Sequence, residues 1–164
     1  MAEKGVGEHI ISILVEDRFG ALQRIAGVFS RRGFNMNTIT VGKTDKPGLS
    51  RMTISTTGSA KTVEQMVKQL SKLVETIKVS EFSESDCVTR EIALCKIHIK
   101  DYNARNEATN FVEVFRGRII DVSHNSMIVE ITGPRDKVDA FMDLMRPFGI
   151  KEFVRTGITA MKRD

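Results

Sequence analysis

Apolar and polar residues follow two different periods along the first half of the chain. Residues 9–16 form an apolar run of the length of a buried strand. Residues 21–32 place apolar residues at the spacing of one helical face, and Gly33 is expected to end that helix. The predicted apolar face of the helix holds Leu22, Ile25, Ala26 and Phe29. The pattern therefore predicts a strand followed by an amphipathic helix.

The rest of the first half continues the same alternation of strands and helices. We predict a strand at 35–44, a strand at 50–58, a helix at 59–74 and a strand at 75–82. Ser59 or Thr62 is a candidate cap for the second helix. The order is strand, helix, strand, strand, helix, strand, which is the βαββαβ order of ferredoxin-like domains.

The second half repeats this order. Its predicted strands are 90–99, 117–123, 126–133 and 151–161, and its helices carry apolar faces at Ala108, Phe111, Val112 and Phe115 and at Val138, Phe141, Met142 and Met145. We therefore predict an α+β fold of two ferredoxin-like βαββαβ domains. The expected boundaries are a domain at 1–82, a polar linker at 83–89 and a domain at 90–164.

Composition and charge exclude several classes of protein. Lys and Arg number 25 against 21 Asp and Glu, without long blocks of one sign, which indicates a mixed, solvated surface. Apolar runs are far shorter than the ~20 residues of a membrane span, and no secretory signal is evident, so we expect a cytoplasmic protein without membrane association. Cys87 and Cys95 form no CxxC motif, and His9, His98 and His124 are scattered, so no metal site is expected.

Catalysis and RNA binding are both disfavoured. The sequence has no phosphate loop, dinucleotide fingerprint, nucleophile elbow or HExxH motif, and we expect no catalytic residues. The segment "RRGFNMN" faintly resembles the signature of an RNA-recognition motif. However, the predicted strands 9–16 and 50–58 hold no Phe, Tyr or Trp on which bases could stack. We therefore expect no nucleic-acid partner.

The junction after the first strand is the best candidate for a ligand site. The first amides of a helix have no acceptor within the helix, so the amides of Gly20, Ala21 and Leu22 could hold a carboxylate. Asp17 could meet an ammonium group, and together these features fit a free amino acid. An ordinary turn explains the same residues, with Asp17 starting it and Gly20 fitting its backbone. The residues alone leave both interpretations open.

The chain as a whole resembles the small regulatory subunit of acetolactate synthase (acetohydroxyacid synthase). The motifs that carry the resemblance are "EDRFGALQRIAGVFSRRGFNMNTITVG", "PGLSRMTI", "REIALCKI", "VEVFRGRIIDVS" and "RTGITAM". The resemblance implies that the first domain is an ACT domain that forms a homodimer. It also implies a non-catalytic subunit that activates a separate catalytic subunit and confers feedback inhibition by valine in branched-chain amino-acid biosynthesis.

The resemblance also implies an effector site and the place of the cofactors. The site would use Asp17, Gly20, Ala21 and Leu22 of one chain with Asn35 and Met36 of the neighbouring ACT domain. Asn35 fits a binding role because asparagine is disfavoured in strands. The family commonly has Asn at position 17 and often Pro at position 19, where this chain has Asp17 and Phe19. Thiamine diphosphate, Mg²⁺ and FAD would belong to the catalytic partner, with no cofactor in this chain.

Overall fold

The computed structural model describes residues 6–163, and these form two compact units. The first unit holds the residues up to Val88 together with those from Ile158 onward, and the second unit is Thr89–Gly157. The elements of the first unit are β1 (Val6–Glu16), α1 (Ala21–Arg32), β2 (Thr38–Lys43), β3 (Leu49–Ser59), α2 (Ala60–Leu70) and β4 (Thr76–Phe82). Both units have the βαββαβ order, which confirms the prediction of two ferredoxin-like domains.

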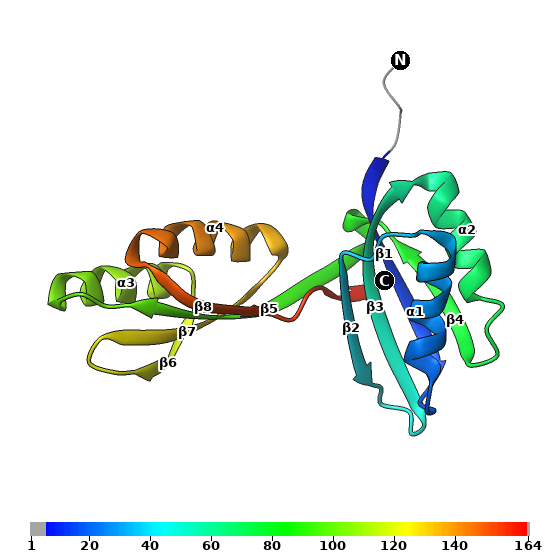
Figure 1. Ribbon diagram of the computed structural model, residues 1–164, viewed down its shortest axis with the longest axis horizontal. Coiled ribbons are helices and arrows are strands. Elements are labelled where there is room, and N and C mark those ends of the chain that lie inside the picture. Colours follow the sequence, from blue (N-terminus) through cyan, green and yellow to red (C-terminus); the bar gives the residue numbers. More distant parts are fainter. Residues whose placement is uncertain (1–5, 164) are drawn as a thin grey trace, which may run out of the picture. The chain divides into compact units, whose positions relative to one another are not determined.

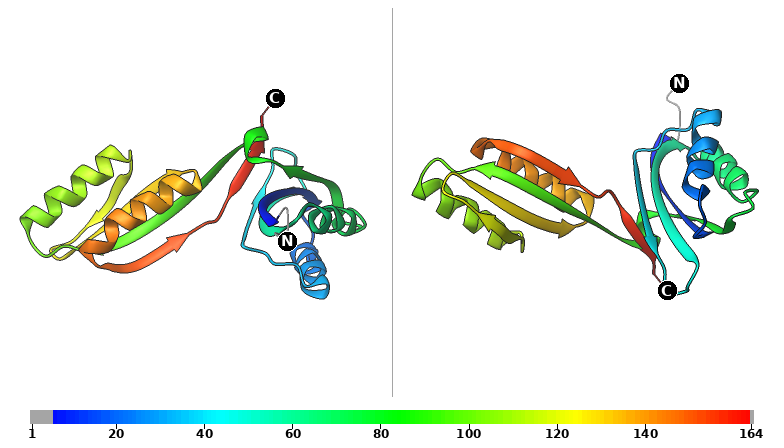
Figure 2. Two further views of the ribbon diagram at one scale, coloured as in Figure 1. Left: turned by 90° about the horizontal axis from the view of Figure 1, so that it is seen from above. Right: turned by 60° about the horizontal axis from the view of Figure 1, so that its bottom comes forward.

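The first unit is a four-stranded antiparallel sheet with both helices on one face (Figures 1 and 2). Its strand order, β2-β3-β1-β4, places β1 and β3 in the centre. Ile11, Ile13 and Val15 alternate along β1 and are buried against the helices. Ser59 caps α2, because its side chain accepts a hydrogen bond from the Thr62 amide at 3.2 Å.

Helix α1 has the predicted bounds but buries a different face from the predicted one. Its buried residues are Ala21, Ile25, Val28 and Phe29. The prediction was wrong for Leu22 and Ala26, which are exposed. Both sets of positions have helical spacing and share Ile25 and Phe29, and the helix is turned by roughly 65° from the expected orientation. Gly33 ends the helix with a left-handed φ of 66°, as predicted.

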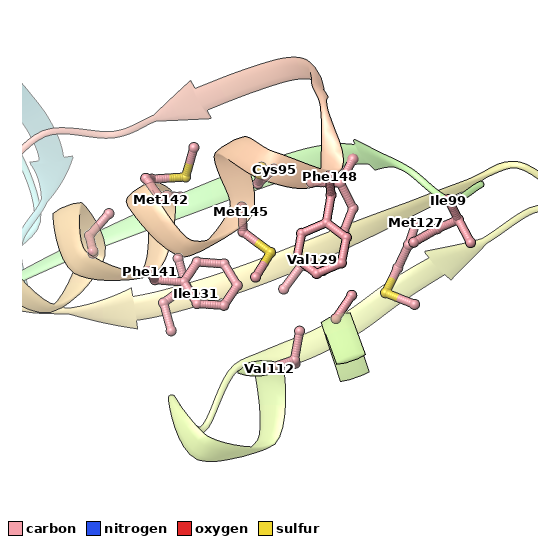
Figure 3. Packing of buried hydrophobic residues seen from close by; sticks show 14 residues of the cluster. Cys95, Ile99, Val112, Met127, Val129, Ile131, Phe141, Met142, Met145 and Phe148 are labelled. Carbon is pink, nitrogen blue, oxygen red and sulfur yellow. The ribbon is translucent and has the colours of Figure 1, made fainter. Parts of the chain in front are cut away.

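The second unit repeats this architecture with the strand order β6-β7-β5-β8. Its elements are β5 (Cys87–His98), α3 (Tyr102–Val114), β6 (Arg118–Val122), β7 (Ser126–Gly133), α4 (Arg135–Met145), a 3-10 turn (Arg146–Phe148) and β8 (Ile150–Arg155). Figure 3 shows Phe141 and Met145 of α4, with Phe148, packed against the strands. All four predicted apolar positions of α4 are buried.

A buried carboxylate in β5 binds the end of β8 in the second unit. Glu91, at 1% exposure, pairs with Arg155 of β8, while Arg155 also donates a 2.7 Å hydrogen bond to Asp139 of α4. Burial acts to lower the pKa of the Arg155 guanidinium, but its bonds to Glu91 and Asp139 outweigh burial and leave that pKa above its ordinary value. Arg135 adds a second cation at 3.7 Å from Glu91.

The expected linker and last strand differ from the structure. Within 83–89, residues Glu84–Asp86 form a 3-10 turn and β5 already begins at Cys87. The single strand predicted at 151–161 is wrong, because the chain breaks after β8 and resumes as β9 (Thr159–Lys162), which pairs with β5. Gly157 lies in this break with φ of 85°, a conformation that interrupts a strand. Residues from Ile158 onward therefore group with the first unit.

Candidate functional site

The turn between β1 and α1 is held by backbone hydrogen bonds from both sides. The Asp17 amide donates to the Gly48 carbonyl in the β2–β3 loop at 2.8 Å, and the Arg18 amide donates to the Glu16 carbonyl at 2.9 Å. Gly20 follows with φ of 84°, a left-handed conformation that glycine adopts readily. The helix start is thus fixed to the end of the central strand and to the neighbouring hairpin.

The first turn of α1 leaves backbone amides without acceptors. Within residues 6–163, the amides of Gly20, Leu22 and Gln23 have no hydrogen-bond partner, no side chain caps the helix, and its first turn carries no acidic residue. One predicted donor is wrong: the Ala21 amide already donates to the Arg18 carbonyl at 3.2 Å, because the tight turn folds back on itself. The open amides and the positive end of the helix dipole together favour an anion.

Asp17 does not act as the cap that an ordinary turn would use. Its side chain is exposed, and the part of the chain that the structure describes offers it no hydrogen bond or ion pair. The carboxylate is therefore available beside the open helix start. Phe19 in the same turn is fully exposed.

Leu22 is the apolar neighbour of this helix start. Because α1 buries Ala21 and Ile25 instead, Leu22 keeps 48% of its surface exposed and is free to contact a ligand. Arg24, one turn into the helix, pairs with Glu75 at 2.6 Å, and the Glu75 carbonyl accepts from the Glu16 amide at 2.9 Å. These contacts hold the first turn of α1 against the end of β1.

Asn35 and Met36 lie beyond the other end of α1. The helix has 12 residues, so Asn35 is about 18 Å from the turn within one chain. Asn35 is exposed and donates through Nδ2 to Asn37 Oδ1 at 2.7 Å, which leaves its Oδ1 as a free acceptor among the described contacts. Met36 is half-buried against the core of the first unit. The six predicted residues therefore form two groups that no single chain brings together.

Gln23 was not among the predicted site residues, although its amide is one of the open donors. A signal for it was present, because the first four amides of any helix lack intrahelical acceptors. Within residues 6–163, no group of three or more His, Cys, Asp and Glu side chains is arranged to hold a metal ion. No helix among these residues is both long and apolar enough to cross a bilayer.

Comparison with known proteins assigns the chain to a family. Residues 11–78 match the family model described as the AHAS small subunit-like ACT domain, and residues 90–164 match the model of the small subunit of acetolactate synthase. The chain belongs to the acetolactate synthase small-subunit family. This confirms the resemblance seen in the sequence motifs.

Named relatives support the family over the full length of the chain. A probable acetolactate synthase small subunit of Methanothermobacter thermautotrophicus is 48% identical over 99% of this chain and 97% of the relative. The isozyme 3 small subunit of Salmonella typhimurium is 45% identical over 94% of each. The crystal structure of the small subunit from Thermotoga maritima has a TM-score of 0.90 at 45% identity, covering 96% of this chain and 98% of that one. Membership in the acetolactate synthase small-subunit family makes this chain a regulatory subunit whose partner is the catalytic subunit.

Proposed function

We propose that this subunit, in the cytoplasm, activates the catalytic subunit of acetolactate synthase and makes it sensitive to feedback inhibition by valine. Thiamine diphosphate, Mg²⁺ and FAD would be bound by the catalytic subunit, and this chain would supply regulation without catalysis. The open helix start at Gly20 to Gln23, beside the unpaired carboxylate of Asp17, is the observation that carries the proposal.

Each part of a free amino acid has a counterpart at this helix start. The α-carboxylate would accept hydrogen bonds from the amides of Leu22 and Gln23, where the helix dipole favours negative charge. The ammonium group would meet Asp17, and the branched side chain would contact the exposed face of Leu22. An apolar contact of this kind favours valine, leucine and isoleucine over small or charged amino acids.

The second group of residues would come from another copy of the chain. Asn35 and Met36 lie about 18 Å from the turn of their own chain, so they can reach a ligand there only when they belong to a second copy. Strand β2 is an edge strand with the exposed side chain of Val41, which makes it suitable for pairing between two chains. We therefore propose a homodimer through the ACT domains, in which the free Oδ1 of Asn35 completes each site.

Binding would act by favouring one of two conformations of the holoenzyme. A coupling free energy of ~1–3 kcal/mol, or ~5–150-fold in affinity, is typical of allosteric proteins. The hydrogen bonds proposed from the Leu22 and Gln23 amides to the effector carboxylate are sufficient for a coupling free energy of this size, since a hydrogen bond to a charged group contributes ~1.5–3 kcal/mol.

The test is acetolactate formation by the reconstituted holoenzyme across a valine titration. We compare Gly20→Asp with its uncharged isostere Gly20→Asn. Both place a side chain where an added Cβ meets no atom within 4 Å, and both share the strain of φ at 84°. The aspartate also adds negative charge where the effector carboxylate would bind.

We expect Gly20→Asp to raise the half-inhibitory valine concentration at least ~10-fold above that of Gly20→Asn, equivalent to ~1.4 kcal/mol, while activation persists. A Gly20→Asp holoenzyme that is activated and fully sensitive to valine would place the site elsewhere. Equal loss of sensitivity in both variants would refute the electrostatic reason. An amino-acid sensor that works without an enzyme partner is the alternative function, and it predicts that adding this chain leaves acetolactate formation unchanged.

A further inference from the structure

The face of the first sheet opposite its helices carries a row of hydroxyl groups. In the registers of β2, β3, β1 and β4, Thr40 lies opposite Thr53, Thr53 opposite Ser12, and Ser12 opposite Ser80. Residues directly opposite in an antiparallel pair point to the same face, so these side chains form one line across the sheet. Among the described contacts, the hydroxyls of Thr53 and Ser80 have no hydrogen-bond partner. Such groups can bond a ligand.

The next row along the same face carries two cations. Arg51 and Lys78 flank Leu14, each lying opposite it in the register. The guanidinium of Arg51 reaches back to the hydroxyl row, where Nη1 donates to Ser12 Oγ at 3.0 Å. This bond fixes one end of the guanidinium at the hydroxyl row.

Residues 158–162, which include β9, pack against the same face of the sheet beside these rows. Ile158 and Ala160 are buried with Ile10 and Phe82, and the Thr40 hydroxyl donates to the Ile158 carbonyl at 2.9 Å. Figure 2 shows this C-terminal segment on the side of the sheet away from α1 and α2. The segment covers the row of Ile10 and Phe82 and reaches the hydroxyl row at Thr40. Ser12 and Thr53 are buried in the hydroxyl row, while Arg51 and Lys78 of the cation row are exposed.

Between the strands and this segment lies a cavity of about 770 Å³. Its volume falls in the range of ~300–1,000 Å³ found for small-molecule sites. Lys43 and Lys162 join Arg51 and Lys78 in its lining, against the single carboxylate of Asp45. No ion pair is formed by Lys43, Arg51 or Lys78 in the described part of the chain. The pKa of the Asp86 carboxyl is lowered, mainly by a hydrogen bond with Ser83 and to a smaller extent by the positive charge of Lys162.

We propose that this cavity binds a phosphate-bearing small molecule, separately from the amino-acid site at the start of α1. Phosphate presents several acceptor oxygens in tetrahedral arrangement, which suits a guanidinium, ammonium groups and unpartnered hydroxyls that converge from different strands. The apolar edge formed by Leu14 and Met161 leaves room for the rest of the molecule.

The experiment is isothermal titration of the full chain with pyrophosphate at constant ionic strength. The test variant is Arg51→Met with Lys78→Met, which removes two charges from the cavity but keeps the aliphatic stems. The control is Lys61→Met with Lys72→Met, which makes the same change in net charge at exposed positions outside the cavity. Thermal melting without ligand verifies that both variants are folded.

We expect the wild type and the control to bind pyrophosphate with equal affinity and one ligand per chain, and the test variant to bind at least ~10-fold more weakly, because each charged contact to phosphate is strong. Absence of binding to the wild type, or equal loss in both variants, would overturn the site. A parallel titration with malonate tests the ligand class. Binding of malonate as tight as that of pyrophosphate would overturn the assignment to phosphate. Valine binding is measured separately, so failure here leaves the amino-acid site unaffected.

Discussion

Replacing Arg155 by methionine tests how the buried carboxylate of Glu91 is stabilised. Glu91 is 1% exposed, and its partner Arg155 is 25% exposed at the side chain, so the pair is shielded from solvent screening. Breaking a buried ion pair by removing one partner costs ~3–5 kcal/mol, because a charge is left buried without compensation. Arg135 remains 3.7 Å from Glu91, and we therefore expect the lower end, about 3 kcal/mol.

The sequence offers a probe that reports on the second unit alone. The chain has one tyrosine, Tyr102 in α3, and no tryptophan, so tyrosine fluorescence during urea unfolding follows that unit. The exposed pair of Arg146 and Asp143, with 73% and 71% exposed side chains, provides the control. Arg146→Met should change the free energy of unfolding by less than ~1 kcal/mol.

The double variant Glu91→Met with Arg155→Met separates charge from packing. With both charges replaced by apolar side chains of similar volume, the unfolding free energy should return to within about 1 kcal/mol of the wild type. A loss below about 1 kcal/mol for Arg155→Met, or a double variant less stable than Arg155→Met, would refute the reasoning.

Two further predictions concern the Cys95 thiol and the α2 cap. Burial raises the pKa of the Cys95 thiol to about 11, so Cys95 should react with iodoacetamide at pH 8 only after urea unfolds the protein. Mass spectrometry measures the labelling, and rapid labelling of the native protein would contradict the prediction. Since the folded-state pKa is the higher one, the contribution of Cys95 to stability is complete below pH 9 and is lost as pH rises towards 11, a loss that Cys95→Ala should lack. Ser59→Ala should lower the unfolding free energy of the first unit by ~1 kcal/mol, because the Thr62 amide loses its acceptor. Urea unfolding followed by far-UV circular dichroism measures this change. An unchanged unfolding midpoint would exclude a capping role for Ser59.

The fold was predictable where local chemistry marks the ends of elements. Helix α1 begins after Gly20 and ends before Gly33, and both glycines adopt left-handed φ angles that few other residues tolerate. The buried face of α1 was not predictable to one residue, because two overlapping sets of apolar residues have helical spacing. The sheet, rather than the helix, decides that Leu22 is exposed.

The candidate site was predictable in part for the same reason. The turn at Asp17 and Gly20 is local, so its chemistry could be inferred from the residues. That the Ala21 amide is already bonded depends on the fine geometry of the turn, which residue types do not determine. The hydroxyl row was not found in the sequence, because strand register decides that Ser12, Thr53 and Ser80 lie side by side.

The central claim is that valine binds between the helix start of one chain and Asn35 of another. Chains carrying Gly20→Asp are unfolded and refolded with an equal amount of chains carrying Asn35→Ala, and valine binding is measured by titration calorimetry. Each variant alone should bind weakly. In a mixed dimer one site would combine the intact Gly20 of one chain with the intact Asn35 of the other, so the mixture should recover about one quarter of the wild-type sites at wild-type affinity. No recovered binding, or normal binding by Asn35→Ala alone, would contradict a site shared between two chains.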